Sequence, residues 1–260
     1  MPGPQHRDSP VFSGTRLPAI DAMRGIVMVL MAMDHASHVF NAGRYARDSF
    51  TWYPAGAEIP AAQFLTRWVT QLCAPTFLFL AGFVLVLSVA RRQARGDPER
   101  STDADIIKRG IFILLLDPLL MSFGFGEGIV LQVLYAIGAS LCCMVLLRRL
   151  GIRSLLVTGL GILFFGEVLK GLAMWAGDGQ RPGLLGTLLI TGGAVSKDIY
   201  VLYPMIPWLA YMILGWACGK RMLGKDAFNP VRLFTMVGAL SLIAFFIIRG
   251  FNKYGNMLLY

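Results

Sequence analysis

One segment of the sequence, from Ala19 to Phe40, is almost continuously apolar and long enough to cross a lipid bilayer. A bilayer core about 30 Å thick requires roughly 20 residues of helix. The segment also carries ionisable side chains, namely Asp21, Arg24, Asp34, His35 and His38. Each such group inside a bilayer costs about 2–3 kcal/mol or more unless it is paired or hydrated, so we expect this helix to line a polar cavity.

The composition indicates a membrane protein. Hydrophobic residues make up 56% of the 260 residues and charged residues 15%, whereas soluble domains are about 45–50% apolar and about 25% charged. The net charge of +9 comes from basic residues in short loops between apolar segments. Because these residues form no patch interleaved with aromatic side chains, we exclude a nucleic-acid partner. The four cysteines lie in apolar segments and predict neither disulfides nor a metal site.

The apolar segments predict an all-α, polytopic transmembrane helical bundle of about seven spans. These spans are 19–40, 62–90, 106–124, 128–147, 153–176, 201–219 and 230–249. A cytoplasmic N-terminus places most Lys and Arg residues in inside loops, which is the favoured orientation. We expect residues 1–15 to form a disordered tail and residues 16–260 one transmembrane domain. The chain stops on an apolar run, so we expect it to be C-terminally incomplete.

Two segments outside the predicted spans are long. The first, Asn41 to Pro60, is rich in aromatic residues and is predicted to form a lid over one end of the first helix. The second, Gly177 to Tyr200, contains GLLGTLLITGGAV, which is too short and too rich in glycine to span a bilayer. We expect a re-entrant or interfacial piece there.

Asp34 and His35 form the sharpest local feature of the first helix. A neutral imidazole can accept a proton from an amine or a hydroxyl, so His35 is a candidate general base. Neighbouring helical residues diverge by about 100°, so Asp34 cannot orient His35. Asp34 therefore either binds substrate or pairs with a basic residue such as Arg67. Solvation of both side chains at the membrane boundary is the alternative interpretation.

The start of the same helix carries a second charged feature. Asp21, Arg24 and His35 fall within roughly 60° of one another on the helix, with Met28 between them. This stripe is predicted to face the polar cavity. Asp21 and Arg24 are spaced for an ion pair, but Arg24 could equally hold a phosphate group.

The second predicted span combines polar residues with a proline. Arg67 and Gln71 are four residues apart and share a helix face, and Pro75 is expected to kink the helix just after them. Such a kink widens a cavity and suits a substrate passage, although packing around a structural proline explains it as well.

Several later residues allow both a functional and a structural interpretation. Lys108 and Arg109 could bind phosphate or could only mark the cytoplasmic side. Gln132 is an amide at membrane depth and could bind substrate or another helix. Glu167 and Lys170 are spaced for an internal ion pair. The sequence lacks HExxH, GxSxG and a phosphate-binding glycine loop, so no metal is expected.

Five stretches form a recognisable pattern. They are RLPAIDAMRGIVMVLMAMDHASHVF, TRWVTQLCAPTFLFLAGF, KRGIFILLLDPLL, LQVLYAIG and YPMIPWLAYMILGWACGK. This pattern resembles the heparan-alpha-glucosaminide N-acetyltransferase catalytic-domain family, in particular its bacterial branch. The resemblance covers nearly the whole chain from Arg16 onward, and its most specific part is IDAMRG joined to MDH.

The resemblance implies an integral multi-pass membrane enzyme, in the inner membrane if the source is bacterial. Such an enzyme transfers an acetyl group from cytoplasmic acetyl-CoA to a carbohydrate or glycolipid acceptor at the opposite face of the bilayer. In the animal branch the catalytic histidine lies in the loop after the first helix. The segment 41–60 of this chain has no histidine, and Ser37 and His38 follow MDH where bacterial relatives often have Arg and Asp.

The resulting assignment gives each candidate residue a role. His35 deprotonates the acceptor and Asp34 positions it. The candidate ligands of the CoA phosphates are Arg24, Lys108, Arg109 and Arg67. The candidate acceptor-binding residues are His38, Asp21, Gln71 and Gln132. Direct transfer and a ping-pong route through an acetylated His35 both remain open.

A different class of protein fits the same charged residues. A solute or proton-coupled transporter would use them as a pathway through the membrane. No internal repeat supports this alternative. The sequence also leaves the oligomeric state open, a homodimer included.

Overall fold

The computed structural model describes residues 18–41, 61–121, 128–179, 181–224 and 230–251. The α-helices are α1 (Pro18–Phe40), α2 (Ala61–Thr70), α3 (Cys73–Ala94), α4 (Glu99–Leu116), α6 (Val133–Leu147), α7 (Ile152–Phe164), α8 (Gly166–Trp175), α9 (Leu184–Gly186), α10 (Met205–Met222) and α11 (Pro230–Phe251). Two π-helices are η1 (Asp117–Met121) and η2 (Thr187–Thr191). The strands are β1 (Ile129–Leu131), β2 (Gly193–Ala194) and β3 (Ile199–Val201).

The largely helical fold is confirmed, although the predicted span 128–147 begins with β1 and the predicted span 153–176 is divided into α7 and α8. The first span corresponds to α1 and the last to α11, while the third begins earlier than predicted, at Glu99. The predicted tail 1–15, most of the predicted lid and the end of the chain lie outside the described residues.

By length and apolar composition, fewer described helices qualify as membrane spans than the sequence predicts. Trp68–Ala94 and Val231–Ile248 qualify, and α7 and α8 would form a third span if the pair, bent by 67°, crosses the membrane together. Several other described helices are too short or too charged to qualify as membrane spans. For example, α6 has only 15 residues, and the first turns of α4 are rich in charge.

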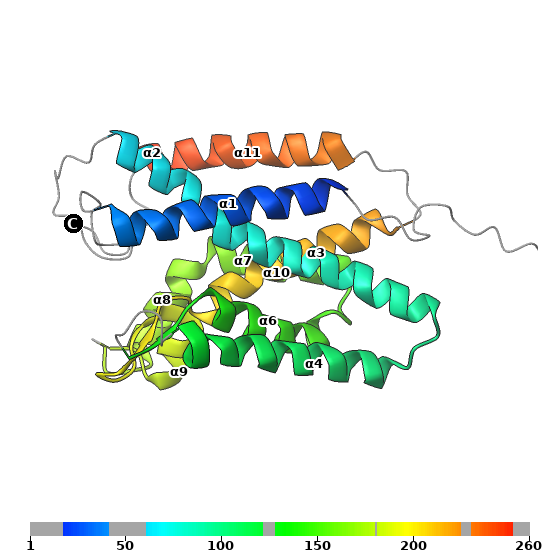
Figure 1. Cartoon of the computed structure of the whole chain (residues 1–260), viewed down its shortest axis with the longest axis horizontal. Helices are drawn as coiled ribbons and strands as arrows, with labels where there is room; N and C mark the ends of the chain where they lie inside the picture. Colours follow the sequence, from blue (N-terminus) through cyan, green and yellow to red (C-terminus); the bar gives the residue numbers. More distant parts are fainter. Residues whose placement is uncertain (1–17, 42–60, 122–127, 180, 225–229, 252–260) are drawn as a thin grey trace, which may run out of the picture.

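The core of the bundle is built around α10, which packs on α3, α6 and α7, while α4 packs on α6. Leu78, Met212 and Ile213 are among its fully buried side chains. A second layer consists of α1, α2 and α11 (Figure 1). Of these, α1 contacts α2 and α3, and α11 touches α2 through the rings of Trp68 and Phe245. Residues 231–248 are all exposed, so α11 adds little to the core.

Glycines allow the central helices to approach closely. A Cβ atom at Gly215 would overlap the carbonyl oxygen of Phe79, and one at Gly82 would overlap that of Met212. Gly215 and Gly219 form a GxxxG pattern on α10, which is typical of helices packed at short range in membranes. In the same way, Gly110 of α4 faces Gly138 of α6.

A small sheet corrects the all-α prediction. Its strand order is β1-β3-β2, in which β1 pairs with β3 in parallel and β2 pairs with β3 antiparallel. Ile129 is opposite Ile199, and Leu131 is opposite Val201. The segment 177–200, predicted as a re-entrant or interfacial piece, holds β2 and the start of β3 and, before them, the three-residue α9 and the five-residue η2. Both of these helices are too short to cross a bilayer.

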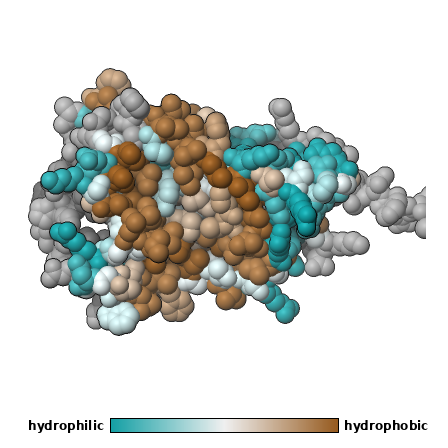
Figure 2. All heavy atoms as spheres, turned by 90° about the horizontal axis from the view of Figure 1, so that it is seen from below, coloured by the Kyte–Doolittle hydropathy of each residue, from teal (hydrophilic) through white to brown (hydrophobic). Residues whose placement is uncertain are grey.

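The two ends of the bundle differ in charge. The connections α3–α4 and α6–α7 and the last turn of α10 lie at one end, which we call the basic end (Figure 1). We call the opposite end, which carries the sheet, the distal end. Figure 2 shows a face with a broad hydrophobic band between hydrophilic residues, which gather most densely at the basic end. Such a band is the pattern expected of a protein surrounded by lipid.

Candidate active site

The side of α1 that faces the bundle carries Arg24 and Asp34. Both are half-buried, and Val27, between them in the sequence, is buried. Cys73 donates from its Sγ to the carbonyl oxygen of Val27 at 3.6 Å, which joins α1 to the start of α3. Arg24 and Asp34 are ten residues apart in the sequence and therefore lie about 15 Å apart along the helix axis.

Asp34 is held by a hydroxyl group from α2. Thr70 Oγ1 donates to Asp34 Oδ1 at 3.0 Å. This contact lies where α2 ends at Thr70, so a fixed carboxylate stands beside an interruption in the helix. The prediction that Asp34 pairs with Arg67 cannot be compared with this contact, because the side chain of Arg67 lies outside the described residues.

The interruption between α2 and α3 has a cause in the sequence. Pro75 has no backbone N–H, so it cannot bond to the carbonyl of Gln71, four residues earlier. Residues 71 and 72 form a turn, and α3 starts at Cys73. The break thus precedes the proline by a few residues, close to the kink that the sequence predicts. Gln71, expected on a helix face with Arg67, lies in this turn and is exposed.

Of the predicted stripe on α1, only Arg24 is half-buried against the bundle. Asp21 and His35 are exposed, and Met28 between them is 59% exposed. At about 100° per residue, these three residues lie roughly 80–120° around the helix from Val27, on the flank of α1. Within the described part of the chain, no ion pair joins Asp21 to Arg24.

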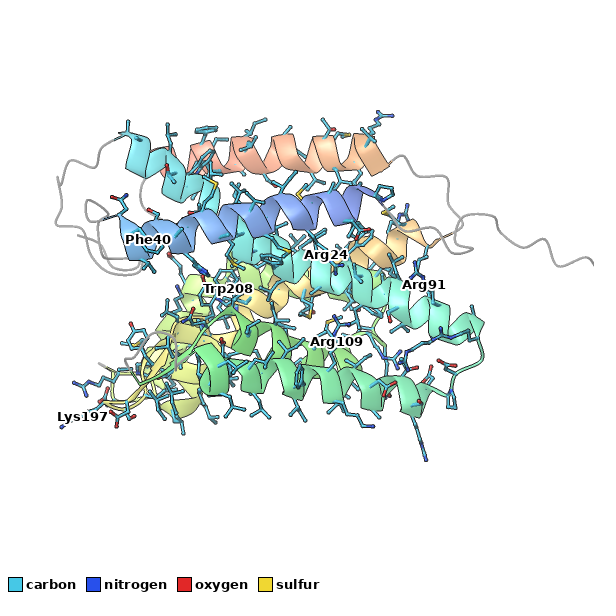
Figure 3. The ribbon with its side chains drawn as sticks, in the orientation of Figure 1. Arg24, Phe40, Arg91, Arg109, Lys197 and Trp208 are labelled. Atoms are coloured by element: carbon cyan, nitrogen blue, oxygen red, sulfur yellow. The ribbon has the colours of Figure 1, made fainter. Side chains whose placement is uncertain are left out.

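The predicted CoA-binding residues come from separate layers. Lys108 and Arg109 are exposed on α4, which packs on α6, while Arg24 belongs to α1, which packs on α2 and α3. Figure 3 places Arg24 and Arg109 on these two layers. The structure therefore does not gather the predicted cations into one cluster.

The remaining candidates are dispersed. Gln132 lies between β1 and α6, at the distal end. The side chain of His38 lies outside the described residues. In the described part of the chain, no ion pair joins Glu167 to Lys170, which corrects the predicted internal pair.

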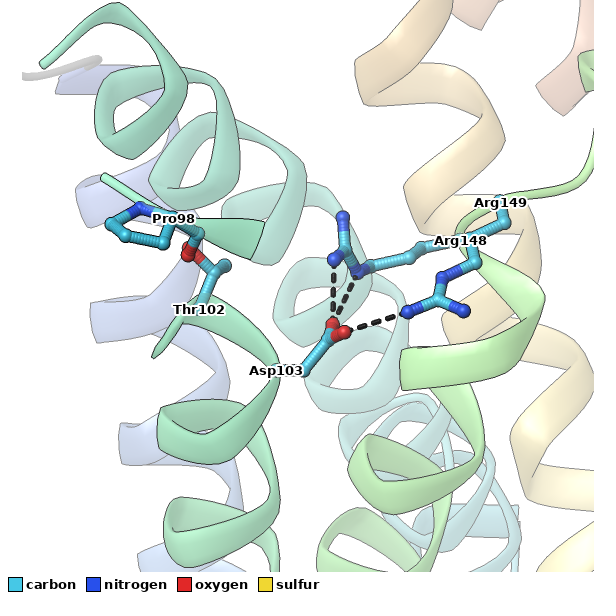
Figure 4. Close-up of polar contacts among 5 residues, drawn as sticks. All are labelled: Pro98, Thr102, Asp103, Arg148 and Arg149. Carbon is cyan, nitrogen blue, oxygen red and sulfur yellow. Dashed lines mark hydrogen bonds and ion pairs between the residues drawn. The ribbon is translucent and has the colours of Figure 1, made fainter. Parts of the chain in front are cut away.

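A buried ion cluster closes the basic end (Figure 4). Arg148 donates from Nε and Nη2 to Asp103 Oδ1 at 3.1 and 2.5 Å, and Arg149 donates from Nη2 to Asp103 Oδ2 at 2.7 Å. The side chain of Arg148 is 5% exposed and that of Asp103 14%. Burial alone would raise the pKa of Asp103, but the hydrogen bonds and charges of the two arginines outweigh it and lower this pKa.

Sequence reasoning missed a second buried carboxylate, Asp117, in η1. Its Oδ2 accepts the backbone N–H groups of Gln132 at 2.8 Å and Tyr135 at 2.6 Å. Asp117 thereby caps the N-terminus of α6 from a different helix, where a negative charge is favourable. Tyr135 in turn donates from its hydroxyl to the carbonyl of Leu188 at 3.2 Å. An Asp-Pro pair inside an apolar run was the signal that could have revealed this residue.

The site as described has the groups for acid–base and binding chemistry. It offers the carboxylate of Asp34, which Thr70 holds in place, and the imidazole of His35, the next residue in the sequence. The positively charged side chain of Arg24 lies further along α1, towards the basic end. Among the described residues, no group of three or more His, Cys, Asp and Glu side chains could hold a metal ion.

Comparison with known proteins identifies the family. The family model described as heparan-alpha-glucosaminide N-acetyltransferase, catalytic, matches residues 16–249. No curated protein and no solved structure matches the chain significantly.

Proposed function

Because the chain belongs to the heparan-alpha-glucosaminide N-acetyltransferase catalytic family, we propose that it transfers an acetyl group from acetyl-CoA to an amino-sugar acceptor. The donor approaches from the basic end, which we assign to the cytoplasm together with the N-terminus. The acceptor binds towards the distal end, where Asp34 meets Thr70. A polytopic protein is suited to this task because each substrate can be presented from its own side of the membrane.

The contact between Asp34 and Thr70 is the observation that carries the proposal. A carboxylate at this depth is costly, and the hydroxyl of Thr70 fixes its direction. A fixed carboxylate can bind the hydroxyl or ammonium groups of an amino sugar through charge-assisted hydrogen bonds. We assign Asp34 to acceptor binding on this basis.

We assign the proton transfer to His35. The acceptor amine must lose a proton when its nitrogen forms the new bond to the acetyl carbon and the thiolate of CoA leaves. The imidazole of His35 accepts that proton and then donates it to the departing thiolate, so that the products are the amide, the free thiol of CoA and neutral His35. His35 follows Asp34 at about 100° around α1, so the two side chains can flank one acceptor without touching each other.

Variants of α1 test these two roles in the purified protein. His35→Ala should lower kcat for acetyl transfer by about 10²- to 10⁴-fold and leave the affinity for CoA unchanged. Asp34→Asn should chiefly raise KM for the acceptor, by about tenfold or more. Asp198→Asn, an exposed carboxylate just before β3 with no assigned role, is the matched control and should change neither value. Full activity of His35→Ala would refute the assignment of the base.

The predicted CoA-binding residues Lys108 and Arg109 lie on α4, and Arg24 lies on α1. The two groups can therefore be tested separately. We propose that Lys108 and Arg109 contact the phosphate groups of CoA at the surface of α4. Arg24 acts further along the path, towards the acetyl group. Calorimetric titration with CoA should show weaker binding for the double variant Lys108→Gln/Arg109→Gln. Weaker binding for Arg24→Gln alone would place the phosphates at α1 instead.

A transporter is the second candidate, and one observation favours it. The helices α7 and α8 are bent by 67° at Phe165, and broken helices commonly form ion and solute sites in transporters. Uptake of labelled glucosamine into vesicles without acetylation would favour this function. Acetylation of glucosamine by the purified protein in detergent would favour the transferase, because no transmembrane gradient exists there.

A further inference from the structure

Three aromatic rings form a continuous cluster at the start of α10. The ring centroids of Tyr203 and Trp208 are 4.7 Å apart, and those of Trp208 and Tyr211 are 5.9 Å apart. All three side chains are half-buried. We call these three residues the aromatic cluster.

The backbone beneath the aromatic cluster is firmly attached. The N–H groups of Leu202 and Tyr203 both donate to the carbonyl of Leu131 in β1, at 2.9 and 3.3 Å. Pro204 follows as the N-cap of α10, with its φ fixed by the ring. The backbone that carries Tyr203 is therefore fixed, and the ring contacts with Trp208 and Tyr211 order the side chains, which lowers the entropy cost of binding.

Helix register places the aromatic cluster at the level of the Asp34 site. Gly215 lies against Phe79, and Gly219 lies against Phe83, so α10 and α3 run in the same direction. Trp208 is seven residues before Gly215, and Leu72 is seven residues before Phe79. The two residues therefore lie at the same level along the pair of helices. Leu72 is in the turn that follows Thr70, the partner of Asp34. In Figure 3, Trp208 accordingly lies between Arg24 and Phe40 along the length of α1.

The burial of Trp208 differs from that of a lipid anchor. Trp and Tyr often line the membrane interface with their rings turned outward. Trp175 has this character, because 80% of its surface is exposed. Trp208 is instead half-buried and packed between two tyrosines.

We propose that the aromatic cluster is the platform on which the ring of the sugar acceptor stacks. A sugar ring has an apolar C–H face, which suits the negative face of an aromatic ring, and hydroxyl groups at its edge, which suit the tyrosine hydroxyls and Asp34. The inference rests on the proposed acetyl transfer and adds the residues that select a cyclic acceptor over other amines.

The test compares two acceptors and two substitutions at one position. Glucosamine supplies a ring, and 2-aminopropane-1,3-diol supplies an amine with hydroxyl groups but no ring. Trp208→Leu keeps apolar volume without a ring, and Trp208→Phe keeps a ring. We expect Trp208→Leu to lower kcat/KM for glucosamine by about tenfold relative to the acyclic amine. Trp208→Phe should largely preserve the preference, and the control Trp175→Leu should leave it unchanged.

An equal loss on both acceptors in Trp208→Leu, or no loss on either, would overturn the proposed platform. Transfer to the acyclic amine also reports whether each variant is folded.

Glucosamine binding measured without a donor distinguishes a failure of the aromatic platform from a failure of the proposed acetyl transfer. Glucosamine is titrated calorimetrically into wild-type protein and Trp208→Leu without any donor. If the wild type transfers no acetyl group but binds glucosamine about tenfold more tightly than the variant, the transferase assignment fails and the platform stands. Equal binding by the two proteins, or none by the wild type, refutes the platform.

Discussion

The ion pairs of Asp103 show how burial determines the contribution of an ion pair to stability. It receives both Arg148 and Arg149, and the side chain of Arg148 is almost fully buried. A second pair at the same end, Arg92 with Asp105, has a similar distance of 2.6 Å, but 45% of the Asp105 side chain is exposed. Water screens the second pair, so the two pairs differ in energy although their shortest N···O distances are similar.

Removing the charge of Asp103 should therefore destabilise the bundle strongly. Asp103→Asn leaves the buried guanidinium of Arg148 without its counter-charge, which costs roughly 3 kcal/mol. The control Asp105→Asn should cost less than about 1 kcal/mol. Unfolding of the protein in mixed micelles measures both values, and similar costs would contradict the assigned difference in burial.

The lowered pKa of Asp103 also predicts how stability depends on pH. In the folded protein this carboxyl binds its proton less readily than in the unfolded chain, where its pKa is about 3.9. The stabilisation is thus complete above that value and disappears as the pH falls through the lower folded pKa. The difference in unfolding free energy between wild type and Asp103→Asn should shrink on acidification below about pH 4. A difference that stays constant or grows would contradict the lowered pKa.

At the scale of elements, the contact between α3 and α10 positions both halves of the proposed site. The first half, Thr70 and the turn after it, leads into α3, and the second half, Trp208, lies on α10. Glycines at the contact let the two backbones meet, so the register between the helices is fixed by backbone atoms rather than by flexible side chains.

Gly215→Ala should break this register. The added methyl group would overlap the carbonyl oxygen of Phe79, and backbone cannot move aside as a side chain can. We expect a loss of about 3 kcal/mol in unfolding free energy. Gly161→Ala on α7 is the control, because nothing lies within 4 Å of its added Cβ. Equal stability of the two variants would show that α3 and α10 are not packed as described.

Most elements of the fold can be predicted from the sequence, because long apolar segments have few alternatives to helices. The sheet could not be predicted in this way. Its strands are two or three residues long, so no alternating pattern develops. Strand β1 also pairs with β3 across about 70 residues of sequence, a pairing that no local signal encodes.

The candidate site could be predicted only in part, because it also depends on contacts between segments that are distant in the sequence. Periodicity indicates which residues share a side of α1, but it does not indicate which side meets the bundle. Asp34 was identified from its type, whereas its partner Thr70 is an ordinary residue of α2 that no motif marks. The sequence predicts that Met28 and His35 face a cavity because they share the more charged side of α1, whereas both are exposed in the structure.

For the molecule as a whole, the proposed function assigns the basic end of the bundle to the donor and the distal end to the acceptor. The hydrophobic band between these ends is the part that lipid would surround (Figure 2). Under the proposed function, the protein moves an acetyl group, but neither of its two substrates, across the bilayer.

Reconstituted vesicles test this claim most directly. Acetyl-CoA labelled in the acetyl group is placed on the side of the basic end, and glucosamine is placed only on the other side. The account predicts labelled N-acetylglucosamine on the acceptor side, with no CoA crossing the membrane, and loss of the product in the His35→Ala variant. Product that forms only when both substrates share one side would contradict it.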